Sequence, residues 1–332
     1  MYFELTASRK TANTRLNDEC CITKYFDMIK NRSSIRYIDE VNNLDIQFLI
    51  KELNSLGRSE STLKNAITLT KKVFNWLIDE AGMTSVENPV PRKFRIPKKN
   101  GLVRDHLPTD DEVKAILNAS ESFSLASSSS APIEKILKFV TYTGCRLGEC
   151  LHAEWEDFDL DKGVWTIRYK EKCPTKNGLG WSPKWGKKRR ITLLPEALDI
   201  INSIPKRISV GFVQIRDEDC KIVDRKPYPA RFVFPKEERK KVGNETHVFY
   251  SRVDSIKTSW NTIKKRSGVQ NIKIKDLRTY FNHMLRSRFG FSSKEAGDYL
   301  GNSCYVNDMH YTPMSETEIR SKLDRVSFTN IL

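Results

Sequence analysis

The stretch IEKILKFVTYTGCRLGE, residues 133–149, decides the fold of this chain. In its first half, Ile133, Ile136 and Val140 follow the three- and four-residue spacing of a helix that buries one face. Its second half, residues 143–149, turns polar and contains a glycine, an arginine and a glutamate. The stretch therefore predicts a buried helix that leads directly into a polar segment.

Strands and further helices follow this stretch along the chain. In residues 163–170 successive side chains would point to opposite faces, as expected for a strand. A second strand is expected over 189–194. Helical patterns resume near Pro195 and again over 253–267. The predicted fold class is mainly α with a small antiparallel β-sheet (α+β).

The length of the chain indicates two domains, because 332 residues exceed a single comfortable core. We expect a helical N-terminal domain over residues 1–87 and a second domain over 107–332. Residues 88–106 read as a linker, since three prolines interrupt regular structure there. A Thr109–Glu112 capping box predicts the first helix of the second domain. The apolar stripes expected in the N-terminal helices are Leu44, Phe48, Leu49, Leu53 and Leu56, then, after a cap at Ser59, Leu63, Ile67, Val73, Phe74 and Leu77.

The charge of the chain points to a polyanionic partner. Its 57 Lys and Arg residues outnumber 42 Asp and Glu residues, and the net charge is +15. Such a field attracts nucleic acid and releases its counterions on binding. The candidate phosphate contacts are Lys64, Lys71 and Lys72 on a helix and Arg92, Lys93, Arg95, Lys98 and Lys99 in the linker. The alternative is that these side chains are simply solvated.

Other classes of protein are disfavoured by the composition. The longest apolar runs fall far short of the ~20 residues that span a bilayer, and the first ten residues lack a signal-peptide core. The seven cysteines are an odd number without a C-x-x-C pair, so we expect neither a disulfide scaffold nor a metal site. We expect a cytoplasmic protein with no cofactor, associated with the nucleoid when bound to DNA.

The second domain contains four motifs in order: Thr143-Gly-Cys-Arg146-Leu-Gly-Glu149, Lys184-Trp-Gly-Lys-Lys-Arg-Arg190, Lys275-Asp-Leu-Arg278, and Leu300-Gly-Asn302 followed by Tyr311 nine positions after Asn302. In this order and spacing they resemble the tyrosine recombinase (phage integrase) family. The resemblance covers residues 107–323. Lys275 stands where the family usually has histidine, and Asn302 stands where histidine or tryptophan is usual.

The resemblance implies a catalytic role for six residues. Tyr311 is the expected nucleophile, Arg146 and Arg278 the phosphate clamp, and Lys184 the general acid; Lys275 and Asn302 complete the expected site. The chemistry agrees, because a metal-free phosphoryl transfer needs fixed cations on the non-bridging oxygens. Arginine supplies a planar, permanently charged fork for this purpose.

Simpler roles exist for each of these side chains. Arg146 could form a surface ion pair with Glu149, Tyr311 could merely pack at the domain edge, and Asn302 could cap a helix. Lys176 is the alternative general acid. Tyr305 is the rival nucleophile, although it follows Asn302 by only three positions.

The resemblance implies a two-domain C-shaped clamp on double-stranded DNA, with residues 1–87 as a core-binding (SAM-like) domain. The implied activity is site-specific integration, excision or transposition of a mobile element through a 3′-phosphotyrosyl intermediate, by a homotetramer, with a second recombinase or accessory protein as a further partner. Two alternatives stay open: a type IB topoisomerase-like enzyme, and a catalytically impaired DNA-binding regulatory or architectural protein. A general RNA-binding protein would agree with the charge alone.

Overall fold

The computed structural model describes residues 2–6, 10, 12–33, 35–91, 94, 106–126, 131–175, 178–216, 222–311 and 320. The chain forms two compact units, Met1–Leu102 and Val103–Leu332, and each has its own hydrophobic core. They are called the N-terminal unit and the C-terminal unit below. Among the described residues, no helix combines the length and the apolar character needed to cross a bilayer.

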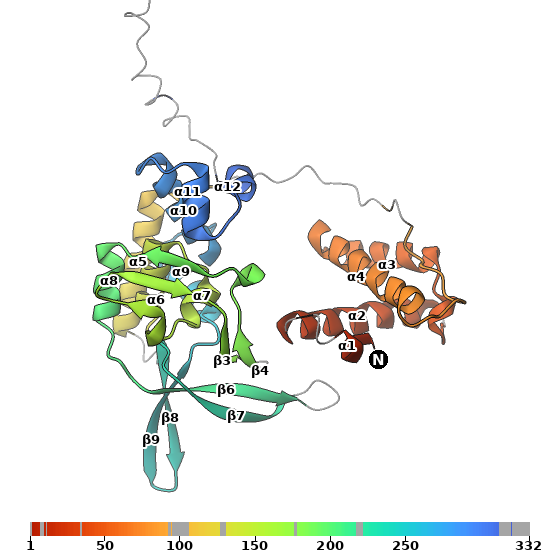
Figure 1. Cartoon of the computed structure of the whole chain (residues 1–332), viewed down its shortest axis with the longest axis horizontal. Helices are drawn as coiled ribbons and strands as arrows, with labels where there is room; N and C mark the ends of the chain where they lie inside the picture. The colour runs from red at the N-terminus through yellow and green to blue at the C-terminus, as the bar shows by residue number, and fades with distance from the viewer. Residues whose placement is uncertain are drawn as a thin grey trace, which may run out of the picture. The chain divides into compact units, whose positions relative to one another are not determined.

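The N-terminal unit is helical (Figure 1). Its elements are α1 (Tyr2–Leu5), α2 (Ala12–Ser33), the 3-10 helix η2 (Ile38–Glu40), α3 (Asn43–Ser55) and α4 (Glu60–Asp79). Helices α2, α3 and α4 pack against one another. Their buried faces supply Tyr25, Ile29, Ile46, Leu49, Leu53, Leu63, Ile67 and Phe74. The Ser59 hydroxyl caps α4, as the sequence predicts, by accepting a hydrogen bond from the Thr62 backbone N–H at 3.3 Å.

The apolar stripe predicted for α3 is wrong at both ends. Leu44 and Leu56 are exposed, because Leu44 lies in the first turn and Leu56 lies beyond the last helical residue. The buried face instead runs through Ile46, Leu49 and Leu53, which recur at helical spacing.

The C-terminal unit is built mostly from helices. They are α5 (Asp110–Ala126), α6 (Ile133–Thr143), α7 (Leu147–Leu151), the 3-10 helix η3 (Trp155–Asp157), the 3-10 helix η4 (Lys184–Gly186), α8 (Pro195–Asn202), α9 (Lys257–Ser267), α10 (Ile274–Ser287), α11 (Ser293–Leu300) and α12 (Cys304–Tyr311). Helix α6 is the central one, and α5, α8 and α10 pack around it. Its residues Ile136, Leu137 and Phe139 are fully buried, so the buried helix expected from the sequence is confirmed.

Three small sheets accompany these helices. Their strands are β1 (Phe158–Asp159), β2 (Val164–Ile167), β3 (Lys170–Thr175), β4 (Gly178–Trp181), β5 (Arg189–Thr192), β6 (Ser209–Arg216), β7 (Ile222–Ala230), β8 (Pro235–Val242) and β9 (Glu245–Arg252). The first sheet has the order β1-β2-β5 and is antiparallel, and its β2 and β5 are the two predicted strands. The fold class, helix-rich with small antiparallel sheets, is confirmed.

The other two sheets were not predicted. Strands β3 and β4 form a separate hairpin, which lies in the chain segment that connects β2 to β5. Strands β6 to β9 form a four-stranded sheet in the order β7-β6-β9-β8, in which β6 and β9 run parallel where Val210 pairs with Ser251. The hairpins β6–β7 and β8–β9 project from the body of the unit (Figure 1).

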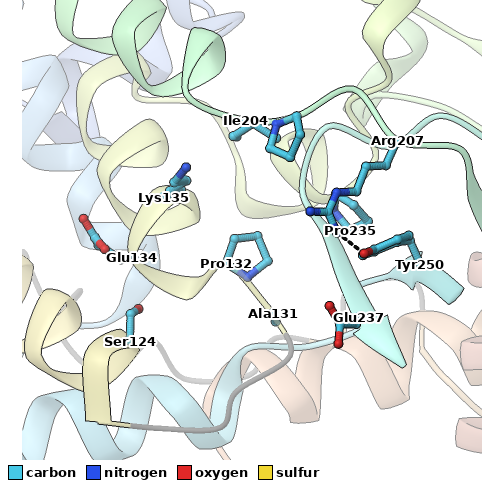
Figure 2. Close-up of a pocket in the computed structure, with 11 residues that line it drawn as sticks. Ser124, Ala131, Pro132, Glu134, Lys135, Ile204, Arg207, Pro235, Glu237 and Tyr250 are labelled. Atoms are coloured by element: carbon cyan, nitrogen blue, oxygen red, sulfur yellow. Dashed lines mark hydrogen bonds between the residues drawn. The ribbon is translucent and has the colours of Figure 1, made fainter. Parts of the chain in front are cut away.

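A cavity of about 330 Å³ lies near the base of these hairpins (Figure 2). Pro132 and Lys135 from the start of α6 line one side, and Pro235 and Tyr250 from β8 and β9 line another. Arg207 donates a hydrogen bond to the Tyr250 hydroxyl and lies over its ring. None of the catalytic residues expected from the sequence lines this cavity, so it is separate from the candidate site described next.

Candidate active site

The turn after α6 brings Arg146 into the site. Gly144 ends α6 in the left-handed conformation, with φ of +60°, and Arg146 then serves as the N-cap of α7. Only glycine fits here, because a β-carbon at position 144 would lie 2.4 Å from Phe281 Cδ1 on α10. The glycine of the motif therefore has a structural role, because it ends α6 where the backbone lies tightly against α10.

Arg146 and Arg278 converge on one acceptor. The Asn302 side-chain oxygen, Oδ1, accepts a hydrogen bond from Arg146 Nη2 at 3.2 Å and another from Arg278 Nη2 at 2.9 Å. Arg278 also donates to the backbone carbonyls of Gly144 at 2.8 Å and Leu300 at 2.7 Å. The structure thus joins α7, α10 and the residue that follows the end of α11.

The two arginines differ in exposure. Arg278 is 5% exposed and is held by main-chain carbonyls, whereas the Arg146 side chain is 26% exposed. The Asn302 amide nitrogen, Nδ2, is buried and has no hydrogen-bond partner among the described residues. Since the two guanidinium groups can only donate, the oxygen of Asn302 must face them, and its N–H donors remain available.

Glu149 ties Arg146 to a third arginine. Its carboxylate, 2% exposed, accepts from Arg146 Nη1 at 2.9 Å and from Arg189 at 3.0 and 2.6 Å. Burial opposes ionisation of Glu149, but the hydrogen bonds and charges of Arg189 and Arg146 outweigh it and hold its pKa below the ordinary value. Glu149 is therefore an ionised partner that orients the arginines.

This arginine cluster (Arg146, Arg189, Arg278, Glu149 and Asn302) carries an excess of positive charge. It contains three guanidinium groups and one carboxylate, which leaves two uncompensated charges. Arginine forks of this kind bind the oxygens of phosphate esters through short, charge-assisted hydrogen bonds. The cluster can therefore bind and stabilise a phosphoryl group.

The remaining predicted catalytic residues lie close in sequence to residues of the cluster. Lys184 is exposed in η4, five residues before Arg189, and Lys275 is exposed in the first turn of α10, three residues before Arg278. Tyr311 is the last residue of α12, which packs on α10 and α11, and its side chain is outside what the structure describes. The alternative acid Lys176 also lies outside the described residues.

Most of the expected DNA contacts lie outside the described residues, namely Arg92, Lys93, Arg95, Lys98 and Lys99. On α4, Lys72 is exposed and Lys71 is half-buried. Lys64 forms an ion pair with Glu60, with 2.5 Å between Nζ and Oε1. Lys72 thus has the most accessible charge of the three.

Sequence reasoning missed Arg189 as a site residue. It lies in a run of four consecutive cations, residues 187–190. Arg189 is the first residue of β5, and its side chain points inward and binds Glu149. The only signal was its position at the start of an expected strand. The described residues contain no group of three or more His, Cys, Asp or Glu side chains able to hold a metal ion.

Comparison with known sequences identifies relatives of this chain. The family described as "Phage integrase family" matches residues 108–312. The chain is 26% identical over 227 residues to the prophage integrase IntR of Escherichia coli K12, covering 65% of this chain and 48% of that protein. It is 26% identical over 150 residues to the tyrosine recombinase XerD of Bifidobacterium longum, covering 44% and 46%. The chain therefore spans about half the length of these curated relatives.

Solved structures share the fold. The integrase of transposon Tn1549 in complex with transposon right end DNA aligns with a TM-score of 0.66 at 16% identity, over 98% of this chain and 97% of that one. A lambda integrase tetramer bound to a Holliday junction aligns with a TM-score of 0.59 at 17% identity, over 95% and 77%. The family match covers more than half of the chain and includes Arg146, Arg278, Asn302 and Tyr311. On this evidence the chain belongs to the phage integrase family of tyrosine recombinases.

Proposed function

We propose that this protein is a site-specific recombinase that cleaves and rejoins double-stranded DNA through a 3′-phosphotyrosyl link to Tyr311. The proposal rests on the convergence of Arg146 and Arg278 on a single acceptor, the oxygen of Asn302. The non-bridging oxygens of a scissile phosphate are acceptors of the same kind. The excess positive charge of the arginine cluster would stabilise the charge that develops on them.

In the proposed reaction the Tyr311 phenol oxygen attacks the phosphorus atom. The phosphorus–tyrosine bond forms while the bond to the 5′ oxygen of the next nucleotide breaks, and the phenol proton passes to an acceptor. Because the free phenol has a pKa near 10, the cationic surroundings must favour its ionised form. The 5′-hydroxyl of a second strand then attacks the phosphotyrosine and reverses the step.

Three further residues have proposed roles. Lys184 donates a proton to the leaving 5′ oxygen, and its place in η4, five residues before the β5 residue Arg189, supports this assignment. Asn302 orients Arg146 and Arg278 on the phosphate, because its side-chain oxygen accepts a hydrogen bond from each. Lys275, one helical turn before Arg278, contacts the phosphate backbone.

The proposal extends to the DNA and to the assembly. Both units contact duplex DNA in this proposal, with the linker and α4 contacting phosphates. The Tn1549 and lambda integrases are described as complexes with DNA, and one lambda complex is a tetramer. We extend this to four protomers on two recombination sites of a mobile element at the nucleoid, with a second recombinase or accessory protein as a further partner. The exchange conserves phosphoester energy and so requires no cofactor.

A nicked suicide substrate tests the nucleophile. Cleavage next to the nick releases a short strand, which traps the covalent protein–DNA adduct for detection on a denaturing gel. We expect an adduct with the wild type and none with Tyr311→Phe. The matched control is Tyr305→Phe, since Tyr305 is exposed on the same helix α12 and should be dispensable. An adduct that persists in Tyr311→Phe but disappears in Tyr305→Phe would assign the nucleophile to Tyr305.

The outcome of the reaction is tested with two DNA sites of different length. A recombinase yields joined products that combine both sites, whereas a topoisomerase-like enzyme only relaxes supercoils. A purely DNA-binding protein forms no adduct at all.

A further inference from the structure

A second polar cluster lies at the C-terminal end of α7. It consists of His152, Lys170, Trp181 and Arg252, and is called the His152 cluster here. His152 is the C-cap of α7, Lys170 begins β3, Trp181 ends β4 and Arg252 ends β9. The cluster therefore joins α7 to the inserted hairpin β3–β4 and to the base of the four-stranded sheet.

The hydrogen bonds of His152 fix its tautomer. Its Nε2 lies 3.2 Å from Arg252 Nη1, and because a guanidinium only donates, Nε2 must accept. Its Nδ1 therefore carries the proton and donates to the Gly148 carbonyl at 2.7 Å. Burial, with the charges of Arg252 and Lys170, lowers the pKa of His152 to about 3, so the ring is neutral at physiological pH.

Trp181 packs face to face on this fixed ring. The two ring centroids are 5.3 Å apart and the planes differ by 16°. Trp181 also pairs with Lys170 across the hairpin, and Lys170 Nζ lies 5.7 Å from the Trp181 ring centroid. Lys170, with a side chain 5% exposed, is held by Asp157 at 2.5 Å and Glu154 at 3.3 Å. The base of the hairpin is thus fixed on both strands.

Lys184 lies in sequence between Trp181 and Arg189, which contact the α7 C-cap His152 and the α7 residue Glu149. Trp181 precedes it by three residues, and the intervening link contains Pro183, which is buried and restricts the chain. Arg189 follows it by five residues and binds Glu149. Arg146 is the N-cap of α7, Glu149 lies within it and His152 is its C-cap, so this short helix carries Arg146 together with the partners of Arg189 and Trp181.

From this arrangement we infer that His152 and Trp181 are positioning residues, which aim Lys184 at the phosphate held by Arg146. The inference rests on the proposed function, in which Lys184 is the general acid. The buried Lys170 ion pairs agree with a geometric role, because ion pairs of this kind often stabilise a fold no more than apolar residues would.

The test compares two leaving groups in single-turnover cleavage of the suicide substrate. In one DNA the scissile 5′ oxygen is normal, and in the other it is replaced by sulfur. A thiolate is a far weaker base than an alkoxide, as the pKa of about 8.5 of the cysteine thiol illustrates, so it leaves without a proton and the sulfur substrate needs no general acid. A defect in aiming Lys184 should therefore disappear on the sulfur substrate.

We expect Trp181→Ala to cleave the normal substrate about 100-fold more slowly, at the low end for loss of a general acid, and the sulfur substrate at nearly the wild-type rate. Trp181→Phe keeps an aromatic ring on His152 and should recover most of the normal rate. Lys184→Ala should be rescued by sulfur in the same way. Arg146→Ala should be slow on both substrates, since it removes phosphate stabilisation.

Equal slowing of Trp181→Ala on both substrates, or no slowing at all, would overturn the inference. Thermal unfolding and DNA affinity are measured alongside, and His152→Ala replaces Trp181→Ala in the same comparison if the latter fails to fold. The proposed function fails separately, if Tyr311→Phe still forms the adduct. Failure of sulfur to rescue Lys184→Ala would remove Lys184 as the acid, and with it the target of the positioning.

Discussion

Replacing Gly144 by alanine tests whether the turn after α6 sets the arginine cluster. Gly144 has φ of +60°, a conformation that costs about 1 to 2 kcal/mol for a residue with a β-carbon. That β-carbon would lie 2.4 Å from Phe281 Cδ1 and 2.8 Å from Leu300 Cδ2, and such overpacking adds about 1 to 3 kcal/mol. We therefore expect Gly144→Ala to lower the free energy of unfolding by about 2 to 5 kcal/mol.

Gly268→Ala is the matched control for this substitution. Gly268 also ends a helix of the C-terminal unit, α9, with φ of +74°, but a β-carbon there would meet nothing within 4 Å. Its replacement should cost only the conformational part, about 1 to 2 kcal/mol. Urea denaturation followed by tryptophan fluorescence measures both, since five of the six tryptophans lie in the C-terminal unit. Equal losses in the two variants would refute the steric argument.

The same substitution should also impair cleavage. The Gly144 carbonyl accepts a hydrogen bond from Arg278, and Arg146 follows two residues later, so a shift of this turn moves both arginines. Loss of such donors typically slows a reaction by about 100- to 1000-fold. A folded Gly144→Ala variant that forms the covalent adduct at the wild-type rate would contradict this role, whereas Gly268→Ala should cleave normally.

Three further substitutions probe the charges. Glu149→Gln should destabilise the fold by about 3 to 5 kcal/mol at pH 7. The pKa of Glu149 is lowered by folding, so its ionised form stabilises the protein above pH 4.5, its unfolded value, and that stabilisation is lost as the pH falls through the folded value. Denaturation curves of wild type and variant should therefore converge on acidification, and a constant gap would contradict the assignment. Arg278→Lys should slow adduct formation by about 100- to 1000-fold with little change in DNA affinity, because lysine lacks the fork; a parallel loss of affinity would indicate a binding role instead. Lys72→Ala should reduce the slope of log affinity against log salt by about 0.9, and Lys64→Ala by less, since Lys64 is paired with Glu60; an unchanged slope for Lys72→Ala would remove it from the DNA interface.

The helical part of the fold could be predicted because its sequence has a clear period. The spacing of Ile133, Ile136 and Val140 predicted α6, and all three residues are buried. The four-stranded sheet was missed for the opposite reason. Strand β8 reads PKEERKKV and is charged along its length. The projecting hairpins are held together by strand pairing and bury few side chains, so such a sequence is tolerated there. Without a buried face, a strand has no alternation to detect.

The candidate site shows the same division between local pattern and tertiary arrangement. The types and spacing of Arg146, Arg278 and Asn302 were readable, including the departure from the usual family residue at position 302. Spacing alone could not show their convergence, which only the resemblance implied, because Arg146 and Asn302 are 156 residues apart and meet only when α6, α10 and α11 pack together. Likewise, nothing in the cationic run 187–190 distinguishes the inward-facing Arg189 from its exposed neighbours.

The sequence by itself determined the helical core of the C-terminal unit and the chemical types available for phosphate chemistry. Periodicity and backbone conformation are local properties, and the order of residues along the chain encodes them directly. Only the tertiary structure decided that Arg146 shares Glu149 with Arg189 and Asn302 with Arg278. It also decided that Trp181 and Arg189, on either side of Lys184, contact His152 and Glu149. Such contacts depend on the direction in which each side chain leaves its helix or strand, and that direction is fixed only when the elements pack.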